Sequence, residues 1–217
     1  MITVDVSAIV TCYKKEEYLQ ECIDSIKRNT KQAKEIIVVH DACPHPKLIE
    51  GVTNIVLPEN LGVCLARDVG FRLSTGLLIL FVDGDDVLSP DYIEKMVLTI
   101  TDEGADITYP DVFIWAGEKS SLSIYPNRFT LKQIMENNKT LTPPVTSLMK
   151  REVYENLGGF RNLSVLEDLD FFIRALRKGY KFVKSQTLLW YRRSGDTRNS
   201  APLVVRKRVL KDILGKK

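Results

Sequence analysis

The first hundred residues alternate between short apolar runs and segments whose apolar residues recur at helical spacing. Val4 to Val10 is mostly β-branched or small and apolar, and a second such run spans Ile36 to Val39. Between these runs, one helical face is formed by Tyr18, Leu19, Cys22, Ile23 and Ile26. Strand, helix, strand is the pattern of a βαβ unit, in which the two strands are parallel. The sequence therefore predicts an α/β fold, a mostly parallel sheet with covering helices.

The same alternation continues to about residue 105. We expect a short strand over Asn54 to Leu57 and a central strand over Leu77 to Val82, the most apolar run in the chain. Ser89-Pro90-Asp91 predicts a helix start, with a capping hydroxyl and a proline at the first helical position. The helix expected between the two strands has an apolar face made of Leu65, Ala66, Val69 and Leu73.

The alternation weakens after residue 105. Strand-like pieces are expected over residues 107–109 and 112–115, and helices over 130–138 and from about 166 to 179. A chain of 217 residues is long enough for one domain, which we divide into halves 1–105 and 106–200. Residues 201–217 form a tail of different character.

This tail is basic and amphipathic. It contains six basic residues and one acidic residue, whereas the whole chain has a net charge of +3. Its apolar residues recur at helical spacing, which predicts a helix with an apolar stripe beside a basic face. Such a helix either packs on its own domain with a solvated basic side, or lies on an anionic membrane or a nucleic-acid backbone. The stripe consists of Val205, Val209, Leu210, Ile213 and Leu214.

Composition and cysteine usage suggest where the chain is kept. With 44% hydrophobic and 27% charged residues it resembles a soluble globular protein, and no apolar run approaches the ~18 residues that cross a bilayer. Because its start also lacks the regions of a signal peptide, we expect a cytoplasmic protein.

Four widely spaced cysteines form no CxxC pair, so we expect free thiols that cannot supply a zinc set by themselves. These are Cys12, Cys22, Cys43 and Cys64. His40 and His45 lie beside prolines in a loop and give little reason to expect imidazole ligation of a metal.

Three carboxylates follow the most apolar strand, in the segment Asp83-Gly84-Asp85-Asp86. Open α/β sheets bind ligands at the carboxyl ends of their strands. Carboxylates this close repel one another unless a cation or partial protonation relieves them, so Asp83 and Asp85 are candidates to hold Mg²⁺ or Mn²⁺. Such an ion usually completes its shell with water and substrate phosphate, which points to a nucleotide or phosphoryl ligand. The alternative is a polar loop whose acids cap the next helix.

A second acid cluster, Glu167-Asp168-Leu169-Asp170, lies within a predicted amphipathic helix. Acids in a first turn favour the helix dipole, which is one explanation of the cluster. The other explanation is that one of them is a general base for a substrate hydroxyl. The chain contains neither a GxGxxG fingerprint nor a Walker A loop, which argues against dinucleotide enzymes and P-loop ATPases.

Five segments together carry a resemblance to a known family: Val6 to Leu19, Glu35 to Asp41, Glu59 to Gly62, Ala66 to Gly70 and Phe81 to Asp86. In this order and at these spacings, the chain resembles the family 2 glycosyltransferases over about residues 4 to 193. The resemblance implies the Rossmann-like GT-A fold, a mixed and mostly parallel sheet with helices on both faces. It also implies that residues 1–105 bind a nucleotide sugar and residues 106–200 bind the acceptor within the same domain.

The resemblance implies a set of donor-binding residues. Thr11 and Tyr13 match the loop that receives the base of the nucleotide, and Asp41 matches the acid that hydrogen-bonds this base. Arg67 matches a basic residue near the nucleotide and its phosphates. Asp83 matches the first acid of the DxD pair, near the ribose and the metal.

The resemblance also implies the residues of the reaction itself. Asp85, with Asp83, matches the DxD acids that hold a Mn²⁺ or Mg²⁺ cofactor. Glu167 and Asp168 match the acid pair before the acceptor helix, with Asp168 as the expected base. The implied reaction is a single in-line displacement that inverts the configuration of the sugar. We expect a UDP-sugar as donor and a glycan or lipid-linked oligosaccharide as acceptor, with peripheral membrane contact through residues 201–217.

Two positions depart from the family pattern. His40 stands where relatives often have a first aspartate, and Ser194 falls near a position where they often carry a histidine close to the metal. Arg192 and Arg193 are therefore candidates for contacts that take part of the phosphate charge.

Other functions stay open at this point. A strand that runs into Asp83-Gly84-Asp85-Asp86-Val87 also fits the start of a haloacid-dehalogenase-type phosphatase, although about 80 residues precede it here. A non-catalytic binder of sugar nucleotides would keep the first site and lack the base. A modified base in DNA is an alternative acceptor, suggested by the basic tail.

Overall fold

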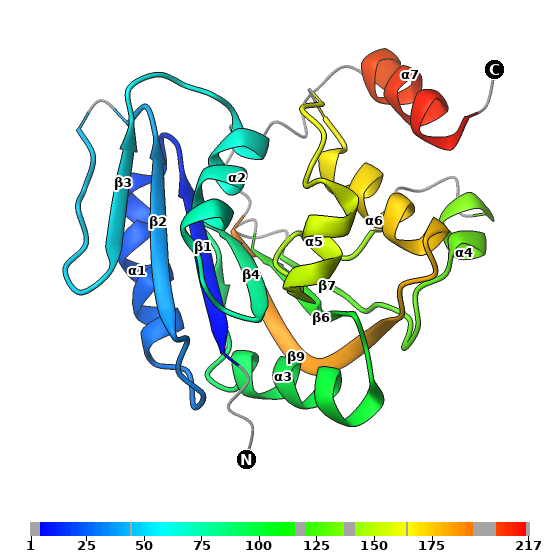
Figure 1. Cartoon of the computed structure of the whole chain (residues 1–217), viewed down its shortest axis with the longest axis horizontal. Coiled ribbons are helices and arrows are strands. Elements are labelled where there is room, and N and C mark those ends of the chain that lie inside the picture. The colour runs from blue at the N-terminus through cyan, green and yellow to red at the C-terminus, as the bar shows by residue number, and fades with distance from the viewer. Residues whose placement is uncertain are drawn as a thin grey trace.

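The computed structural model describes residues 5–43, 45–115, 120–136, 142–163, 165–192 and 203–215. One nine-stranded sheet runs through the molecule, and helices lie on both of its faces (Figure 1). The first half contains β1 (Val6–Cys12), α1 (Glu16–Lys27), β2 (Glu35–Asp41), β3 (Thr53–Leu57), α2 (Val63–Leu73), β4 (Leu78–Asp83), β5 (Val87–Leu88) and α3 (Tyr92–Glu103). The second half contains β6 (Ile107–Trp115), β7 (Ser121–Ser123), α4 (Leu131–Glu136), β8 (Leu148–Lys150), α5 (Arg151–Leu157), α6 (Glu167–Arg177), β9 (Phe182–Arg192) and α7 (Leu203–Leu214).

The sheet is mixed, with its parallel part in the first half. Its order is β3-β2-β1-β4-β8-β6-β9-β5, with β7 paired to β6. Strands β1 to β4 are parallel to one another, β8 is antiparallel to both β4 and β6, and β9 returns parallel to β6. This arrangement confirms the predicted α/β fold with a mixed, mostly parallel sheet.

Strand β1 shows why the apolar runs form central strands. All seven of its residues are buried, because helices cover both faces of the sheet. Ala8 and Val10 point into a core shared with α1 and α3, whereas Ile9 points into a core shared with α2, α5 and α6. Since β1 lies between β2 and β4, the carboxyl ends of these three strands meet at one edge. There Thr11 pairs with Asp83.

The predicted apolar face of α2 was right for Ala66, which is buried, and for Val69, which packs against the core, but wrong for Leu65 and Leu73. Leu65 and Leu73 are 40% and 54% exposed, and the buried residues of the helix are Cys64, Ala66, Arg67, Gly70 and Phe71. Gly70 lets the helix approach β1 so closely that a Cβ atom on it would lie 2.4 Å from Cγ2 of Ile9. Arg67 can be buried because acidic side chains neutralise it. The helix therefore presents to the sheet a face that contains a glycine and an arginine.

The start of α3 differs in detail from the prediction. The helix begins at Tyr92, and the Ser89 hydroxyl contacts Asp91 and Thr187 instead of capping the backbone. The side-chain oxygen of Asn29, from the end of α1, accepts the hydrogen bond of the Ile93 amide at 2.8 Å. A side chain distant in sequence thus caps this helix.

The two strand-like pieces after residue 105 are one strand, β6. Its pairing with β9 shifts register between Tyr109 and Asp111, where Pro110 cannot donate to the ladder. The bulge divides the strand into the two pieces that the sequence suggests. The predicted helix over 130–138 corresponds to α4, and residues 137–138 lie outside the described residues.

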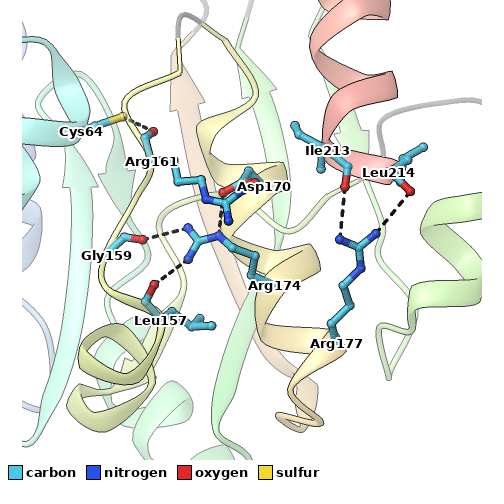
Figure 2. Close-up of polar contacts among 9 residues, drawn as sticks. All are labelled: Cys64, Leu157, Gly159, Arg161, Asp170, Arg174, Arg177, Ile213 and Leu214. Carbon is cyan, nitrogen blue, oxygen red and sulfur yellow. Dashed lines mark hydrogen bonds and ion pairs between the residues drawn. The ribbon is translucent and has the colours of Figure 1, made fainter. Parts of the chain in front are cut away.

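The described part of the tail, α7, packs on its own domain (Figure 1). Ile213 is buried, and Val209, Leu210 and Leu214 pack against the core that contains α5 and α6. Arg177 of α6 donates to the carbonyl oxygens of Ile213 and Leu214 at 3.3 and 3.4 Å (Figure 2). This confirms the packed alternative for the apolar stripe from 209 to 214. Among the described residues, no helix has the length and apolar character needed to cross a membrane.

Candidate active site

A buried arginine connects the two acid clusters. The Nη2 atom of Arg67 donates to Oδ1 of Asp83 at 2.8 Å, and Nη1 donates to Oε1 of Glu167 at 3.4 Å. The Arg67 side chain is 3% exposed, and its guanidinium lies 5.2 Å from the centre of the Phe160 ring. Acids that are 84 residues apart in sequence therefore share one cation, so both clusters predicted from the sequence belong to one site.

The acid pair stands at the start of α6. Leu166, just before it, is buried and has a left-handed backbone with φ of 63°. The Leu169 amide donates to Oδ1 of Asp168 at 2.7 Å. Burial and the adjacent Glu167 carboxylate raise the pKa of Asp168 to about 6, and Asp83 adds to this increase. A carboxyl group with this pKa is suited to accept a proton near neutral pH.

Asp170, the third acid of this cluster, has a structural role. Its buried carboxylate accepts from Nε of Arg174 at 2.7 Å and from Nη1 of Arg161 at 3.3 Å (Figure 2). Arg174 also donates to the carbonyl oxygens of Leu157 and Gly159, both at 2.8 Å. This network fixes the loop from α5 to α6, which carries the Phe160 ring beside Arg67.

Asp85 lies beside a lysine that the sequence analysis did not single out. Nζ of Lys15 is 3.4 Å from Oδ2 of Asp85, whose side chain is 15% exposed. Burial and the nearby Asp83 carboxylate raise the pKa of Asp85. Between the two acids, the Gly84 amide donates to the Thr11 carbonyl at 2.9 Å, and a Cβ atom on Gly84 would lie 3.0 Å from that oxygen. The glycine is thus needed for close packing on β1.

The third acid of the DGDD segment turns away from this pair. Asp86 is 1% exposed, and its Oδ2 accepts from the Thr146 hydroxyl at 3.1 Å. The hydroxyl of Tyr92 in turn donates to the Thr146 carbonyl. Asp86 therefore ties β4 to the segment before β8.

Asp41 holds the start of α2. Its carboxylate is buried and accepts the backbone amides of Leu61 and Gly62 at 2.8 and 3.0 Å. These bonds hold the two residues that directly precede the first turn of the helix. They fix the helix that carries Arg67. Contact between Asp41 and a nucleotide base stays a prediction.

Other predicted residues are placed as follows. Thr11 lies at the end of β1, is 9% exposed and pairs with Asp83 across the strands. Tyr13 is half-buried in the loop after β1, with Nζ of Lys14 5.2 Å from its ring centre. Arg192 ends β9 but its side chain lies outside the described part of the chain, as do Arg193 and Ser194 altogether.

Backbone strain marks the same region. Among the described residues, three that are not glycine have a positive φ: Lys14, Ala42 and Leu166. Lys14 follows Tyr13, Ala42 follows Asp41, and Leu166 precedes Glu167. Such conformations cost about 1–3 kcal/mol each and cluster at functional sites. Their positions support the candidate site independently of its charges.

The acids fit a hard divalent cation. Asp83 and Asp85 supply carboxylate oxygens at the end of a buried strand, which are ligands that Mg²⁺ and Mn²⁺ prefer. Burial and, after it, repulsion from Asp83 raise the pKa of Asp85, and a bound cation would offset both. Each acid already has a cationic neighbour, because Asp83 is bonded to Arg67 at 2.8 Å and Oδ2 of Asp85 lies 3.4 Å from Nζ of Lys15. A bound metal would share the two carboxylates with these cations.

Sequence reasoning missed three residues of this site: Lys15, Phe160 and Tyr125. The pKa of the Tyr125 hydroxyl is raised to about 12 by burial and by the Asp168 carboxylate. Lys15 directly follows the predicted base-binding loop, which was a signal for it. No local pattern distinguishes Phe160 or Tyr125 from core aromatic residues.

The comparisons with known proteins agree with this site. The model of the family described as "Glycosyl transferase family 2" matches residues 7–158. "Uncharacterized glycosyltransferase YwdF" of Bacillus subtilis is 30% identical over 186 residues, 79% of this chain and 68% of the relative. An "Uncharacterized glycosyltransferase" of Haemophilus influenzae is 28% identical over 188 residues, 79% of this chain and 62% of the relative.

Among solved structures, S. aureus TarS 1-349 in complex with UDP-GlcNAc matches with a TM-score of 0.75 and 20% identity. The match covers 98% of this chain and 66% of the TarS chain. This likeness supports the GT-A fold. The chain thus spans about two thirds of the length of these relatives. Because the family model covers well over half of it, the chain belongs to glycosyl transferase family 2.

Proposed function

We propose that the protein transfers a sugar from a nucleotide-diphospho-sugar to an acceptor hydroxyl, with inversion of configuration. The observation that carries this proposal is the Arg67 bridge between Asp83 and Glu167. This bridge brings Asp83, an acid proposed to bind the donor, close enough to Asp168, the proposed base, to raise its pKa. Family membership favours sugar transfer over the phosphatase alternative.

The donor is proposed to lie at the carboxyl ends of β1, β2 and β4. Thr11 and Tyr13 border the place of the base, and Arg67 supplies positive charge near the phosphates. The complexes of TarS with UDP-GlcNAc and UDP support a UDP-sugar as donor. When bound at Asp83 and Asp85, Mn²⁺ or Mg²⁺ would neutralise charge on the departing diphosphate.

Asp168 is proposed to remove the proton of the acceptor hydroxyl. With its pKa near 6 it is ionised at neutral pH and still basic enough to accept a proton. Glu167, bonded to Arg67, keeps Asp168 next to a negative charge and so keeps this pKa raised. A single displacement inverts the configuration, because the acceptor oxygen attacks the anomeric carbon on the side opposite the departing diphosphate.

The acceptor is proposed to be a glycan or a lipid-linked oligosaccharide. The apolar stripe of α7 packs on the domain from 209 to 214 and leaves Val205 exposed, and Arg208 and Lys211 are exposed as well. Peripheral contact with an anionic membrane would therefore rest on charge instead of insertion of apolar residues. The same charge keeps DNA as the alternative acceptor.

The test is the substitution Asp168→Asn, with Asp102→Asn as a control on the exposed side of α3. We expect Asp168→Asn to lower turnover at least ~100-fold while donor affinity changes little, since general-base catalysis contributes roughly 10²–10⁴-fold. Asp102→Asn is expected to be as active as the unchanged protein. Near-full activity of Asp168→Asn would refute the assignment of the base. A chain that binds nucleotide sugars and transfers none would be a binder.

A further inference from the structure

Two thiols and an imidazole meet where β1 and β2 end. Cys12 is the last residue of β1, His40 pairs with it across the strands, and Cys43 lies just beyond β2. The three side chains are buried, and their ligand atoms all lie within 4.8 Å of one another. The positive φ of Ala42 turns the chain, so that the Cys43 thiol donates to the Cys12 carbonyl at 3.3 Å.

The neighbouring Asn54 determines which nitrogen of His40 carries the proton. The Nδ2 atom of Asn54 donates to the carbonyls of Ile49 and Val52 at 2.8 and 3.2 Å, and its Oδ1 accepts the Ile49 amide at 3.0 Å. These three bonds fix the orientation of the amide, so the atom 3.1 Å from Nε2 of His40 is Oδ1, an acceptor. Nε2 must therefore be the protonated nitrogen.

The other nitrogen of His40 is left with an unused lone pair. Nδ1 is buried and has no hydrogen-bond partner among the described residues. A neutral imidazole that donates one N–H to an oxygen and keeps its second nitrogen available is the usual state of a metal-ligating histidine. Its cross-strand neighbour is the Cys12 side chain.

We propose that Cys12, His40 and Cys43 form a binding site for a thiophilic transition metal, with Zn²⁺ as the best fit. Two thiolates and one imidazole are a donor set typical of zinc and unsuited to Mg²⁺ or Mn²⁺. Zinc bonds of about 2.3 Å to sulfur and 2.0–2.1 Å to nitrogen place tetrahedral ligands roughly 3.5–3.8 Å apart. Since the ligand atoms lie within 4.8 Å of one another, their separations need to shrink by about 1.3 Å at most.

Metal binding would replace two protons. Burial raises the pKa of the Cys12 thiol to about 11 and raises the pKa of the Cys43 thiol further, so both are protonated without metal. On binding, each S–H bond gives its proton to the solvent and a metal–sulfur bond forms. Two thiolates balance the double charge of the ion, so the buried complex is neutral. Apparent affinity should consequently rise with pH.

The fourth ligand is open to water or to Glu16. The Glu16 carboxylate, at the start of α1, is close enough to the Cys43 thiol to add to the increase in its pKa that burial causes. This site uses residues other than the Asp83 and Asp85 pair, and it does not depend on the proposed reaction. A bound metal would join the ends of β1 and β2, beside the loop proposed to receive the base.

The experiment is a titration of the reduced, metal-free full chain with Co²⁺, followed by absorption spectroscopy. One equivalent should produce the d–d bands of tetrahedral cobalt and near-ultraviolet sulfur-to-cobalt charge transfer. Cobalt held by carboxylates at Asp83 and Asp85 cannot produce the charge-transfer band, because those ligands are oxygens. Absence of that band would overturn the proposal.

Variants locate the metal. Cys43→Ser and His40→Gln should lose the band, and Cys64→Ser should keep it, because Cys64 is a buried thiol bonded elsewhere, to the Arg161 carbonyl (Figure 2). A band that survives in Cys43→Ser would overturn the proposal.

A second measurement needs no variant and covers a failure of these variants to fold. X-ray absorption of the unchanged protein with one equivalent of Zn²⁺ should show two sulfur neighbours at about 2.3 Å. A shell of oxygen and nitrogen alone would contradict the proposal.

Discussion

Replacing Arg67 by methionine would test the bridge on which the site depends. The substitution keeps an unbranched apolar chain beside Phe160 and removes the charge. It deletes a charge-assisted hydrogen bond of 2.8 Å to Asp83, worth about 1.5–3 kcal/mol. It also deletes the longer contact to Glu167, which is worth less than about 1 kcal/mol because Glu167 is partly exposed. The buried Nε of Arg67 has no hydrogen-bond partner among the described residues, so removing it restores about 1 kcal/mol of the free energy of unfolding.

We therefore expect a loss of about 1–3 kcal/mol in the free energy of unfolding at pH 7, since these contributions sum to about that range and the two acids left unpaired are partly exposed to solvent. Arg67 also lowers the pKa of Asp168, so in the variant this pKa rises further. As the pH falls through the raised pKa of Asp168, this carboxylate takes up its proton and the loss should shrink. Urea denaturation followed by circular dichroism at several pH values measures both effects.

Arg72→Met is the matched control on the same helix. Arg72 pairs with Asp68 at 2.7 Å, but its side chain is 75% exposed, so we expect no measurable change in the free energy of unfolding. If Arg67→Met costs no more than this control, or if its cost is the same at every pH, the described bridge does not stabilise the fold.

The remaining predictions concern pH, packing and the tail. The value of kcat/KM should rise with pH through about 6 as Asp168 loses its proton; a profile flat from pH 5 to 8 would exclude it as the base. Because the pKa of Asp168 is raised in the native state, ionisation of this group destabilises the fold. Urea denaturation should therefore show Asp168→Asn to be more stable than the unchanged protein above pH 6 and equally stable near pH 4. Gly70→Ala should cost about 1–2 kcal/mol, since the clash with Ile9 exceeds the roughly 1 kcal/mol gained in helix propensity; a stabilised variant would contradict the packing. Arg177→Met should speed hydrogen exchange in α7 and change the free energy of global unfolding by less than about 0.5 kcal/mol, because the two hydrogen bonds of Arg177 to the helix are long. Unchanged hydrogen exchange would show that these bonds do not hold the helix.

The strands and most helices could be predicted because local pattern determines them. The run that became β4 is buried on both faces, and Leu19, Cys22, Ile23 and Ile26 of α1 are buried as their spacing indicates. The face of α2 could not be predicted this way, since Arg67 is buried only because Asp83 and Glu167 come from other elements. The helix therefore has a face that hydrophobic spacing alone does not reveal.

The site was predictable as a set of residue types and less so as a set of contacts. Asp83 and Glu167 do share one site through Arg67, but no spacing in the sequence shows that Arg161 pairs with Asp170 or that Lys15 pairs with Asp85. The cysteine and histidine cluster was missed for the same reason. Cys12 and His40 are neighbours only because β1 and β2 pair in this register.

The most direct test of the central claim is binding of nucleoside diphosphates and their sugars, measured as thermal stabilisation with and without Mn²⁺. A ligand at ~100 times its dissociation constant stabilises by about 2.7 kcal/mol. We predict a metal-dependent shift with uridine ligands that is lost in Asp85→Ala and kept in Asp102→Asn. No shift with any nucleotide, or an equal shift in Asp85→Ala, would contradict the proposed donor site.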